Sequence, residues 1–235
     1  EIFQNALSTA GNEMAVAMYR TAYSTVVRDC MDYSTSLCNA DGEMIAQGLT
    51  LPMHLGTVPH AMEILLKKYG NELYPGDVFI LNDPFDGGTH TPDIYIIKPI
   101  FWKEQCVAFA VCTAHHLDVG GRVPGTAACD NSNIYQEGLR IPLIKLYEQG
   151  RPNETIFTLL RTNVRVPRML FGDLRAQLAA CHIGERAIHN VIKRYGLETF
   201  VASGKQLIDY TERLMRAEIA TWPDGSFTFT DYLDS

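Results

Sequence analysis

The sequence predicts an α+β or mixed α/β fold, in which a β-sheet core carries a His/Asp metal site and long helices flank the sheet. In residues 1–165, short apolar runs of strand length alternate irregularly with segments of helical periodicity. Residues 166–235 are mostly helical in pattern and lead into one further strand. With 46% apolar residues in 235, the chain can bury a sizeable core.

The order of the elements follows from periodicity and from turn residues. Apolar residues at helical spacing predict helices over residues 3–25, 59–69, 158–164, 172–195 and 197–220. Runs rich in β-branched and aromatic residues predict strands over residues 26–38, 44–46, 77–82, 94–102, 105–113 and 226–230. The Asp41-Gly42 pair predicts a hairpin between the first two strands. Residues 120–141 are rich in Gly, Pro, Asn and Ser, and they predict a long irregular region of the kind that is often functional.

Two histidine-containing clusters, residues 82–93 and residues 113–121, carry most of the chemistry. The two strands between them are predicted to fold back on each other and so bring the clusters side by side. Imidazole nitrogens and carboxylate oxygens without thiolates suit a catalytic Zn, Mn or Fe ion. The alternative is a structural loop that carries surface histidines. Against it, His115 and His116 follow an apolar run, which places them at the end of a buried strand.

Asp32 is a further candidate ligand, because a carboxylate within a β-prone stretch is costly unless it is paired or bound to a metal. A salt bridge to Arg28 or Arg122 is an equally good explanation. The glycine pairs that begin at Gly87 and Gly120 would let the backbone approach a bound group closely.

Composition excludes several classes of function. A net charge of -7 argues against nucleic acid or an anionic membrane as the partner. No apolar run reaches the length of a membrane span and no signal peptide opens the chain, so we expect a cytoplasmic protein. The six scattered cysteines are expected to be reduced, with a nucleophilic Cys112 or Cys129 as a minor alternative. No phosphate-binding loop is present, so any ATP must be bound elsewhere.

Several motifs together resemble the hydantoinase B/oxoprolinase family, and they extend in one order over nearly the whole chain. They are Tyr19-Arg20-Thr21, Asp32-Tyr33-Ser34, Asn82-Asp83-Pro84, Gly87-Gly88-Thr89-His90, Pro92-Asp93, residues 115–121, Glu137-Gly138-Leu139 and residues 172–177. The family includes subunits of ATP-dependent hydantoinases and lactamases, part of 5-oxoprolinase, and large subunits of acetone- and acetophenone-type carboxylases. The resemblance implies that the chain corresponds to an N-terminal portion of a polypeptide about twice its length.

The resemblance also implies a set of site residues. Metal ligands are expected at His90, Asp93 and His115, with Asp32 tied to the same site. Catalytic roles are expected for three polar residues: His116, Asp118 and Asp83. His116 or Asp118 would act as general base or orient a ligand histidine. Substrate contacts are expected from Gly88, Gly120, Gly121, Arg122 and Glu137.

The implied reaction needs a partner. A hydantoinase A-type subunit with an actin-like fold would bind ATP and Mg²⁺ and phosphorylate a cyclic amide, and this chain would then hydrolyse the activated ring within a hetero-oligomer. Two alternatives stay open from the residues. In one, the chain belongs to an ATP-dependent ketone carboxylase. In the other, it is a non-catalytic assembly subunit whose His/Asp cluster pins loops.

Overall fold

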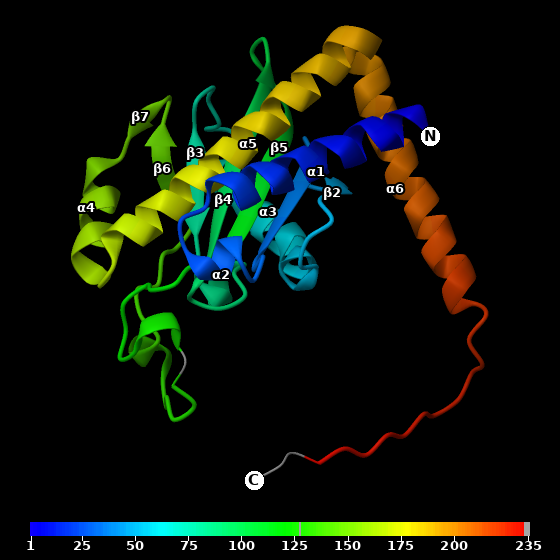
Figure 1. Ribbon diagram of the computed structural model, residues 1–235. Coiled ribbons are helices and arrows are strands. Elements are labelled where there is room, and N and C mark those ends of the chain that lie inside the picture. The colour runs from blue at the N-terminus through cyan, green and yellow to red at the C-terminus, as the bar shows by residue number, and fades with distance from the viewer. Residues whose placement is uncertain (127, 233–235) are drawn as a thin grey trace.

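An antiparallel β-sheet forms the centre of the molecule, and helices cover both of its faces (Figure 1). The structure is a computed structural model that describes residues 1–126 and 128–232. Within these residues the strand order is β2-β1-β5-β4-β3-β6-β7. The strands are β1 (Tyr33–Asn39), β2 (Met44–Gln47), β3 (Val78–Leu81), β4 (Asp93–Trp102), β5 (Gln105–His115), β6 (Ile144–Glu148) and β7 (Arg151–Pro152). The predicted mixed α/β fold is confirmed.

The β4–β5 hairpin joins the two histidine-containing clusters, as the sequence predicted. Asp93, the first residue of β4, pairs with His115, the last residue of β5. On the other side of β5, strand β1 pairs through Tyr33 and Ala114, and the His115 amide donates to the Asp32 carbonyl. Three neighbouring strands therefore place Asp32, His115 and Asp93 at one end of the sheet.

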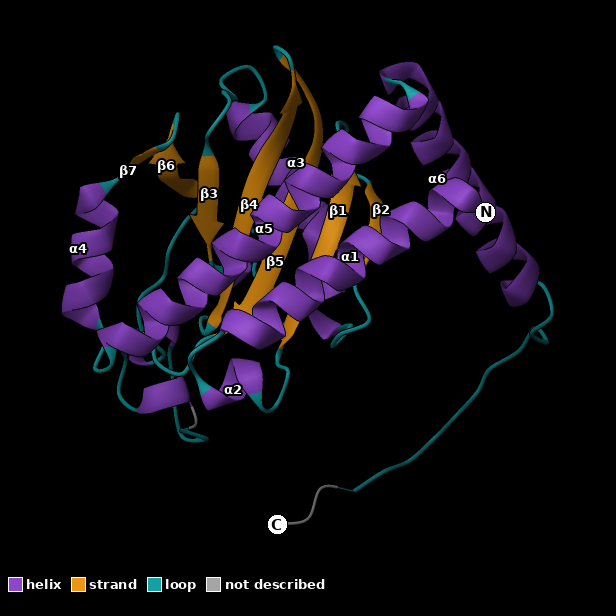
Figure 2. Cartoon of the chain, turned by 45° about the horizontal axis from the view of Figure 1, so that its top comes forward, coloured by secondary structure: helices purple, strands orange, loops and turns teal. Residues whose placement is uncertain are grey.

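Strand alternation decides which face each side chain meets. Helices α1 (Ile2–Thr21) and α5 (Pro167–Tyr195) lie side by side across one face, while α3 (Val58–Tyr69) covers the other (Figure 2). Even positions of β4 and β5, such as Ile96 and Cys112, join the α1/α5 core. Odd positions, such as Ile97 and Val111, pack in the core beneath α3. Asp93 and His115 thus face the α3 side, and His116 is directed to the opposite side.

The structure differs from the predicted elements in several places. Residues 25–28 form a short helix, α2 (Thr25–Arg28), and not the start of a strand, because the Ser24 hydroxyl accepts from the Val27 amide as a helix cap. Strands β6 and β7 were not predicted. Their hairpin turns at Gln149 and Gly150, both at positive φ, and this pair lacks the usual Asn-Gly or Asp-Gly signal.

The predicted strand over residues 226–230 is wrong. These residues follow α6 (Leu197–Ile219) as an exposed segment without strand pairing, and a strand requires a neighbour to bond with. Helix α4 (Glu154–Asn163) begins earlier than expected, and so does α5. Among the helices of the described residues, none is both long enough and apolar enough to cross a membrane.

Candidate metal centre

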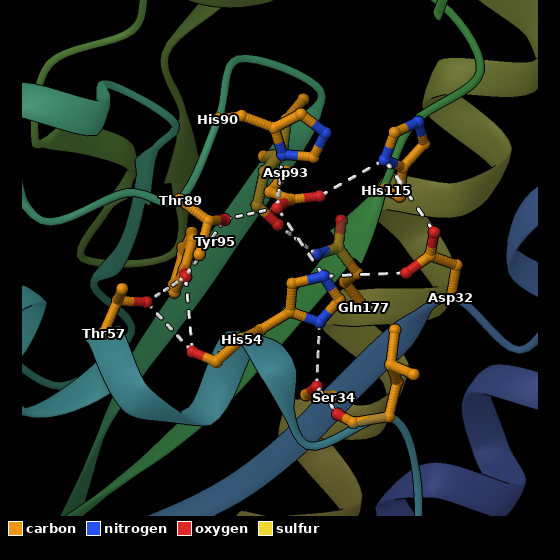
Figure 3. Close-up of polar contacts among 12 residues, drawn as sticks. Asp32, Ser34, His54, Thr57, Thr89, His90, Asp93, Tyr95, His115 and Gln177 are labelled. Atoms are coloured by element: carbon orange, nitrogen blue, oxygen red, sulfur yellow. Dashed lines mark hydrogen bonds and ion pairs between the residues drawn. The ribbon is translucent and has the colours of Figure 1, made fainter. Parts of the chain in front are cut away.

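Five histidine and aspartate side chains converge at the end of the sheet where β4 begins and β5 ends (Figure 3). Asp93 and His115 come from the paired strand ends, and Asp32 immediately precedes β1. His90 lies in the loop before β4, and His54 lies in a 3-10 helix, Met53–Thr57, that leads into α3. The sheet therefore supplies a rigid support for the cluster.

Asp93 is the centre of the cluster and is 1% exposed. One of its oxygens, Oδ2, lies 2.6 Å from His90 Nδ1 and accepts a hydrogen bond from the Thr89 hydroxyl. The other, Oδ1, lies 3.4 Å from His115 Nδ1. Burial alone would raise the pKa of Asp93, but His115, His54, His90 and Thr89 outweigh burial and hold this pKa well below its usual range. Asp93 is therefore a carboxylate at neutral pH.

Asp32 faces the same space from the β1 side. Its Oδ2 lies 3.9 Å from His115 Nδ1, and its Oδ1 lies 3.6 Å from His54 Nε2. The alternative of a salt bridge to Arg28 or Arg122 is wrong, because Arg28 pairs with its neighbour Asp29 and Arg122 pairs with Asp130.

His54 is a member of the cluster that the sequence analysis missed. It is 1% exposed, its Nδ1 lies 2.9 Å from Ser34 Oγ, and its Nε2 lies 3.6 Å from Asp93 Oδ2. No sequence motif marks this residue, because its position depends on how the 3-10 helix packs against the strand ends. The one available signal was a histidine two residues after Pro52 and shortly before the predicted helix over residues 59–69.

The residues fit a divalent metal ion. Ligand atoms of His90, Asp93 and His115 all lie within 4.8 Å of one another. In addition, Asp93 Oδ1 and Asp32 Oδ1 are buried, and neither has a hydrogen-bond partner within the described chain. Buried carboxylate oxygens without donors are costly unless a cation is close by. Two imidazoles and a carboxylate are a donor set typical of catalytic zinc, and also of manganese and iron.

His116 lies on the other face of the sheet from this cluster. Its Nε2 is 3.0 Å from Gln177 Oε1 on α5, and burial lowers the pKa of the imidazole. Gln177 donates its amide hydrogens to the carbonyls of Ile94 on β4 and Cys112 on β5. The placement favours a supporting role for His116 over contact with substrate, and its predicted catalytic role stays a prediction.

The other two predicted catalytic residues hold loops. Asp118 accepts hydrogen bonds from the Gly120 amide, from the Arg165 amide and from the Arg165 guanidinium. Asp83 accepts from the Phe85 amide and lies 3.3 Å from the Arg140 guanidinium. Both carboxylates thus have local structural partners, and their catalytic roles are untested.

Close backbone packing explains the glycines predicted to contact substrate. A Cβ at Gly88 would lie 2.8 Å from the Asn82 carbonyl oxygen, and Cβ atoms at Gly120 and Gly121 would lie 2.6 Å from the backbone oxygens of Asn163 and Gln136. Of the other two predicted substrate contacts, Arg122 is exposed and paired with Asp130. Glu137 lies near His90, whose pKa is raised mainly by the hydrogen bond to Asp93 and only slightly by the charge of Glu137.

The alternative of a cysteine nucleophile gains no support at Cys112. Its thiol is buried on the α1/α5 side of the sheet, and burial raises its pKa well above the ordinary value. Cys129 is exposed.

Comparison with known proteins identifies the relatives of the chain. The hydantoinase B/oxoprolinase family matches residues 1–235. The beta subunit of the caprolactamase of Pseudomonas jessenii is 40% identical over 233 residues, which are 99% of this chain and 40% of that protein. The B-type subunit of a putative D-/L-hydantoinase of Pseudomonas sp. (strain NS671) is 32% identical over 239 residues, 100% of this chain and 40% of that protein.

Solved structures agree with the sequence comparison. The crystal structure of ATP-dependent caprolactamase from Pseudomonas jessenii matches with a TM-score of 0.90 and 40% identity, over 95% of this chain and 39% of that one. Acetone carboxylase matches with a TM-score of 0.80 at 23% identity, over 86% of this chain and 28% of that one, which shows a shared fold alone.

This chain therefore spans about two fifths of the length of these two relatives. The ordered motifs, the sheet and the sequence similarity over the full 235 residues agree with one another. The chain belongs to the hydantoinase B/oxoprolinase family.

Proposed function

We propose that this chain carries the metal centre of an ATP-dependent enzyme that opens cyclic amides by hydrolysis. The observation that carries the proposal is the convergence of His90, Asp93 and His115 at the sheet end, with two buried carboxylate oxygens that lack hydrogen-bond donors in the described residues. The names of two relatives, one from a caprolactamase and one from a hydantoinase, support a cyclic amide as the substrate class.

In this proposal His90, Asp93 and His115 hold a divalent ion, with Asp32 beside them. Such an ion, when bound, lowers the pKa of water from 15.7 to about 7 and polarises a substrate oxygen. The side chains of His90 and Asp32 are 45% and 28% exposed, so water and substrate can approach from that side. In this proposal Asp32 accepts the proton of the attacking water, and Thr89, which donates to Asp93, keeps that carboxylate oriented.

A separate nucleotide-binding subunit of the hydantoinase A type is proposed to activate the substrate. ATP and Mg²⁺ on that subunit would phosphorylate the amide oxygen. Water then adds to the ring carbon, the ring nitrogen takes a proton and leaves as an amine, and the resulting acyl phosphate is hydrolysed to a carboxylate and inorganic phosphate. The ATP dependence stated for the caprolactamase structure and the names of the relatives, which describe them as subunits, support such a hetero-oligomer.

Metal content and ring opening test the proposal together. The complete enzyme should contain a stoichiometric divalent metal and should convert caprolactam, a hydantoin or 5-oxoproline only when ATP is present. His90→Ala and His115→Ala should each abolish metal occupancy and activity while circular dichroism stays unchanged. His60→Ala, which removes an exposed histidine on α3, is the matched control and should alter neither quantity. Full metal occupancy in both ligand variants would refute the assignment.

A further inference from the structure

His54 belongs to a closed ring of alternating histidines and carboxylates. Each carboxylate of the ring presents one oxygen to each histidine. Asp93 directs Oδ1 toward His115 and Oδ2 toward His54. Asp32 directs Oδ2 toward His115 and Oδ1 toward His54. The four separations are 3.4, 3.6, 3.9 and 3.6 Å. Figure 3 shows the four side chains pointing toward one shared space.

From this arrangement we propose that His54 Nε2 is a direct ligand of the cation held at this centre, and that Ser34 fixes the tautomer which makes it one. The inference rests on the proposed function insofar as a metal binds there. It adds a histidine from a different element, the 3-10 helix before α3, to the ligands on the strand ends.

The tautomer follows from the partners of Ser34. The Ser34 hydroxyl donates its single hydrogen to the Leu51 carbonyl, so toward His54 it can only accept. Nδ1 of His54, 2.9 Å away, must therefore carry a hydrogen. In the neutral ring Nε2 then carries no hydrogen and has a free lone pair, and this is the form that binds metals.

The surroundings of Nε2 favour a positive charge. Its neighbours are Asp32 Oδ1 and Asp93 Oδ2, each 3.6 Å away, and His54 is 1% exposed, so water contributes little screening. A buried lone pair between two carboxylates is unfavourable unless a cation lies among them or Nε2 itself carries a hydrogen and donates it to a carboxylate, and Co²⁺ binding distinguishes these two arrangements. The separations are long for hydrogen bonds, but two ligand atoms at about 2.1 Å from one ion lie roughly 3.0–4.2 Å apart.

Co²⁺ binding to the complete, nucleotide-free enzyme tests the proposal, because cobalt absorption reports the ligand set independently of catalysis. The variants are His54→Ala, Ser34→Ala and the exposed control His60→Ala. We expect His54→Ala to change the visible absorption bands and to weaken Co²⁺ binding by more than about 100-fold. Ser34→Ala keeps the imidazole and should weaken binding by about 10- to 100-fold without moving the bands, as expected for a residue that orients a ligand. His60→Ala should match the wild type.

The outcomes separate this inference from the proposed function. If the wild-type enzyme binds Co²⁺ and His54→Ala shows the same bands with less than a 10-fold change in affinity, His54 is a hydrogen-bonding neighbour and the inference is overturned while the metal centre stands. If the wild type binds no cation, the metal centre and this ligand both fail. Should His54→Ala not fold by circular dichroism, Ser34→Ala decides, and unchanged affinity in that variant overturns the inference.

Discussion

Two adjacent histidines have different surroundings because they follow one another at the end of a strand. His115 faces the carboxylates of the candidate centre, whereas His116 faces α5 and meets Gln177. Gln177 uses all of its polar hydrogen-bonding groups there, bonding the carbonyls of Ile94 and Cys112 on two neighbouring strands. It thereby ties the helix to the strand ends that carry Asp93 and His115.

Replacing this glutamine should destabilise the fold. Gln177→Met keeps a similar volume but leaves the His116 Nε2 hydrogen without a partner in a fully buried position. It also removes the amide hydrogen bonds to the Ile94 and Cys112 carbonyls, which keep their bonds within the β4–β5 ladder. The unpartnered hydrogen costs about 1–3 kcal/mol and each lost hydrogen bond about 0.5–1.5 kcal/mol, so for three coupled groups we expect a total of about 3 kcal/mol. Urea unfolding measures the loss. Gln206→Met on an exposed position of α6 is the control and should change stability by less than about 0.5 kcal/mol. Equal urea midpoints for Gln177→Met and Gln206→Met would contradict this role of Gln177.

From the sequence, the main residues of the candidate centre could be identified, but not all of the residues that contact them. The spacing of His90, Asp93 and His115 predicted that they would come together, and the structure does bring them together, although their role as ligands stays a prediction. His54 and Ser34 could not be placed in advance, since their contact depends on packing between a 3-10 helix and β1.

Among the elements, α1 depends on close contact with the sheet edge. A Cβ at Gly11 would lie 2.8 Å from the backbone carbon and oxygen of Gln47, the last residue of β2, and backbone atoms cannot rotate away. Gly11→Ala should therefore destabilise the protein by about 1–3 kcal/mol through overpacking. At Gly204 in α6, the nearest atom would be a side-chain carbon of Ile45 at 3.7 Å. Gly204→Ala should instead stabilise by roughly 0.5–1 kcal/mol through helix propensity. Thermal unfolding of both variants measures the difference, and a shift of the same sign in both would contradict the argument.

The junction of α5 with β4 contains an ion pair that makes stability depend on pH. Lys98, 4% exposed, has its Nζ 3.0 Å from Glu185 Oε1. Burial alone would raise the pKa of Glu185, but His182 and Lys98 outweigh burial, so this pKa is lower than the ordinary value. Because the pKa of Glu185 is lower in the folded state, its ionised carboxylate stabilises the fold above about pH 4.3, which is the pKa of a glutamate in the unfolded chain. This stabilisation is lost as the pH falls through the pKa of Glu185 in the folded state.

Glu185→Gln tests this linkage. Near pH 7 it should cost about 1–3 kcal/mol, because a buried ammonium loses its carboxylate partner. The difference from the wild type should shrink as pH falls below about 4. Chemical unfolding followed between pH 3 and pH 7 would measure it, and a constant difference across that range would contradict the linkage.

Elements with strong local signals were predictable, and those that depend on pairing were not. The β4 and β5 strands are nearly continuous apolar runs, and the turn at Asp41-Gly42 indicated its hairpin directly. Residues 226–230 have the alternation of a strand, but none of the described strands pairs with them. Strand β6 lies near the sheet edge with a half-buried pattern, which weakens the apolar signal that reveals buried strands.

For the molecule as a whole, the sheet separates two cores and leaves the candidate centre at one end, between α3 and the strand ends. A sheet fixed by helices on both faces holds Asp32, Asp93 and His115 in register, which is the rigidity that a catalytic site requires. Because the chain covers about 40% of the length of its caprolactamase and hydantoinase relatives, the activity must be measured on the complete enzyme.

The choice between hydrolysis and carboxylation gives the last prediction. Hydrolysis needs only water at the centre, whereas carboxylation must exclude water from a reactive enolate. His90 is 45% and Asp32 28% exposed in the described chain, which favours access of water. The acetone carboxylase likeness, at 23% identity, supports the fold alone. The complete enzyme, supplied with ATP, should therefore open a cyclic amide at the same rate with and without bicarbonate. Chromatography of the products after addition of labelled bicarbonate measures any carboxylation, and label incorporated into a product formed from a ketone would establish the carboxylase reaction instead.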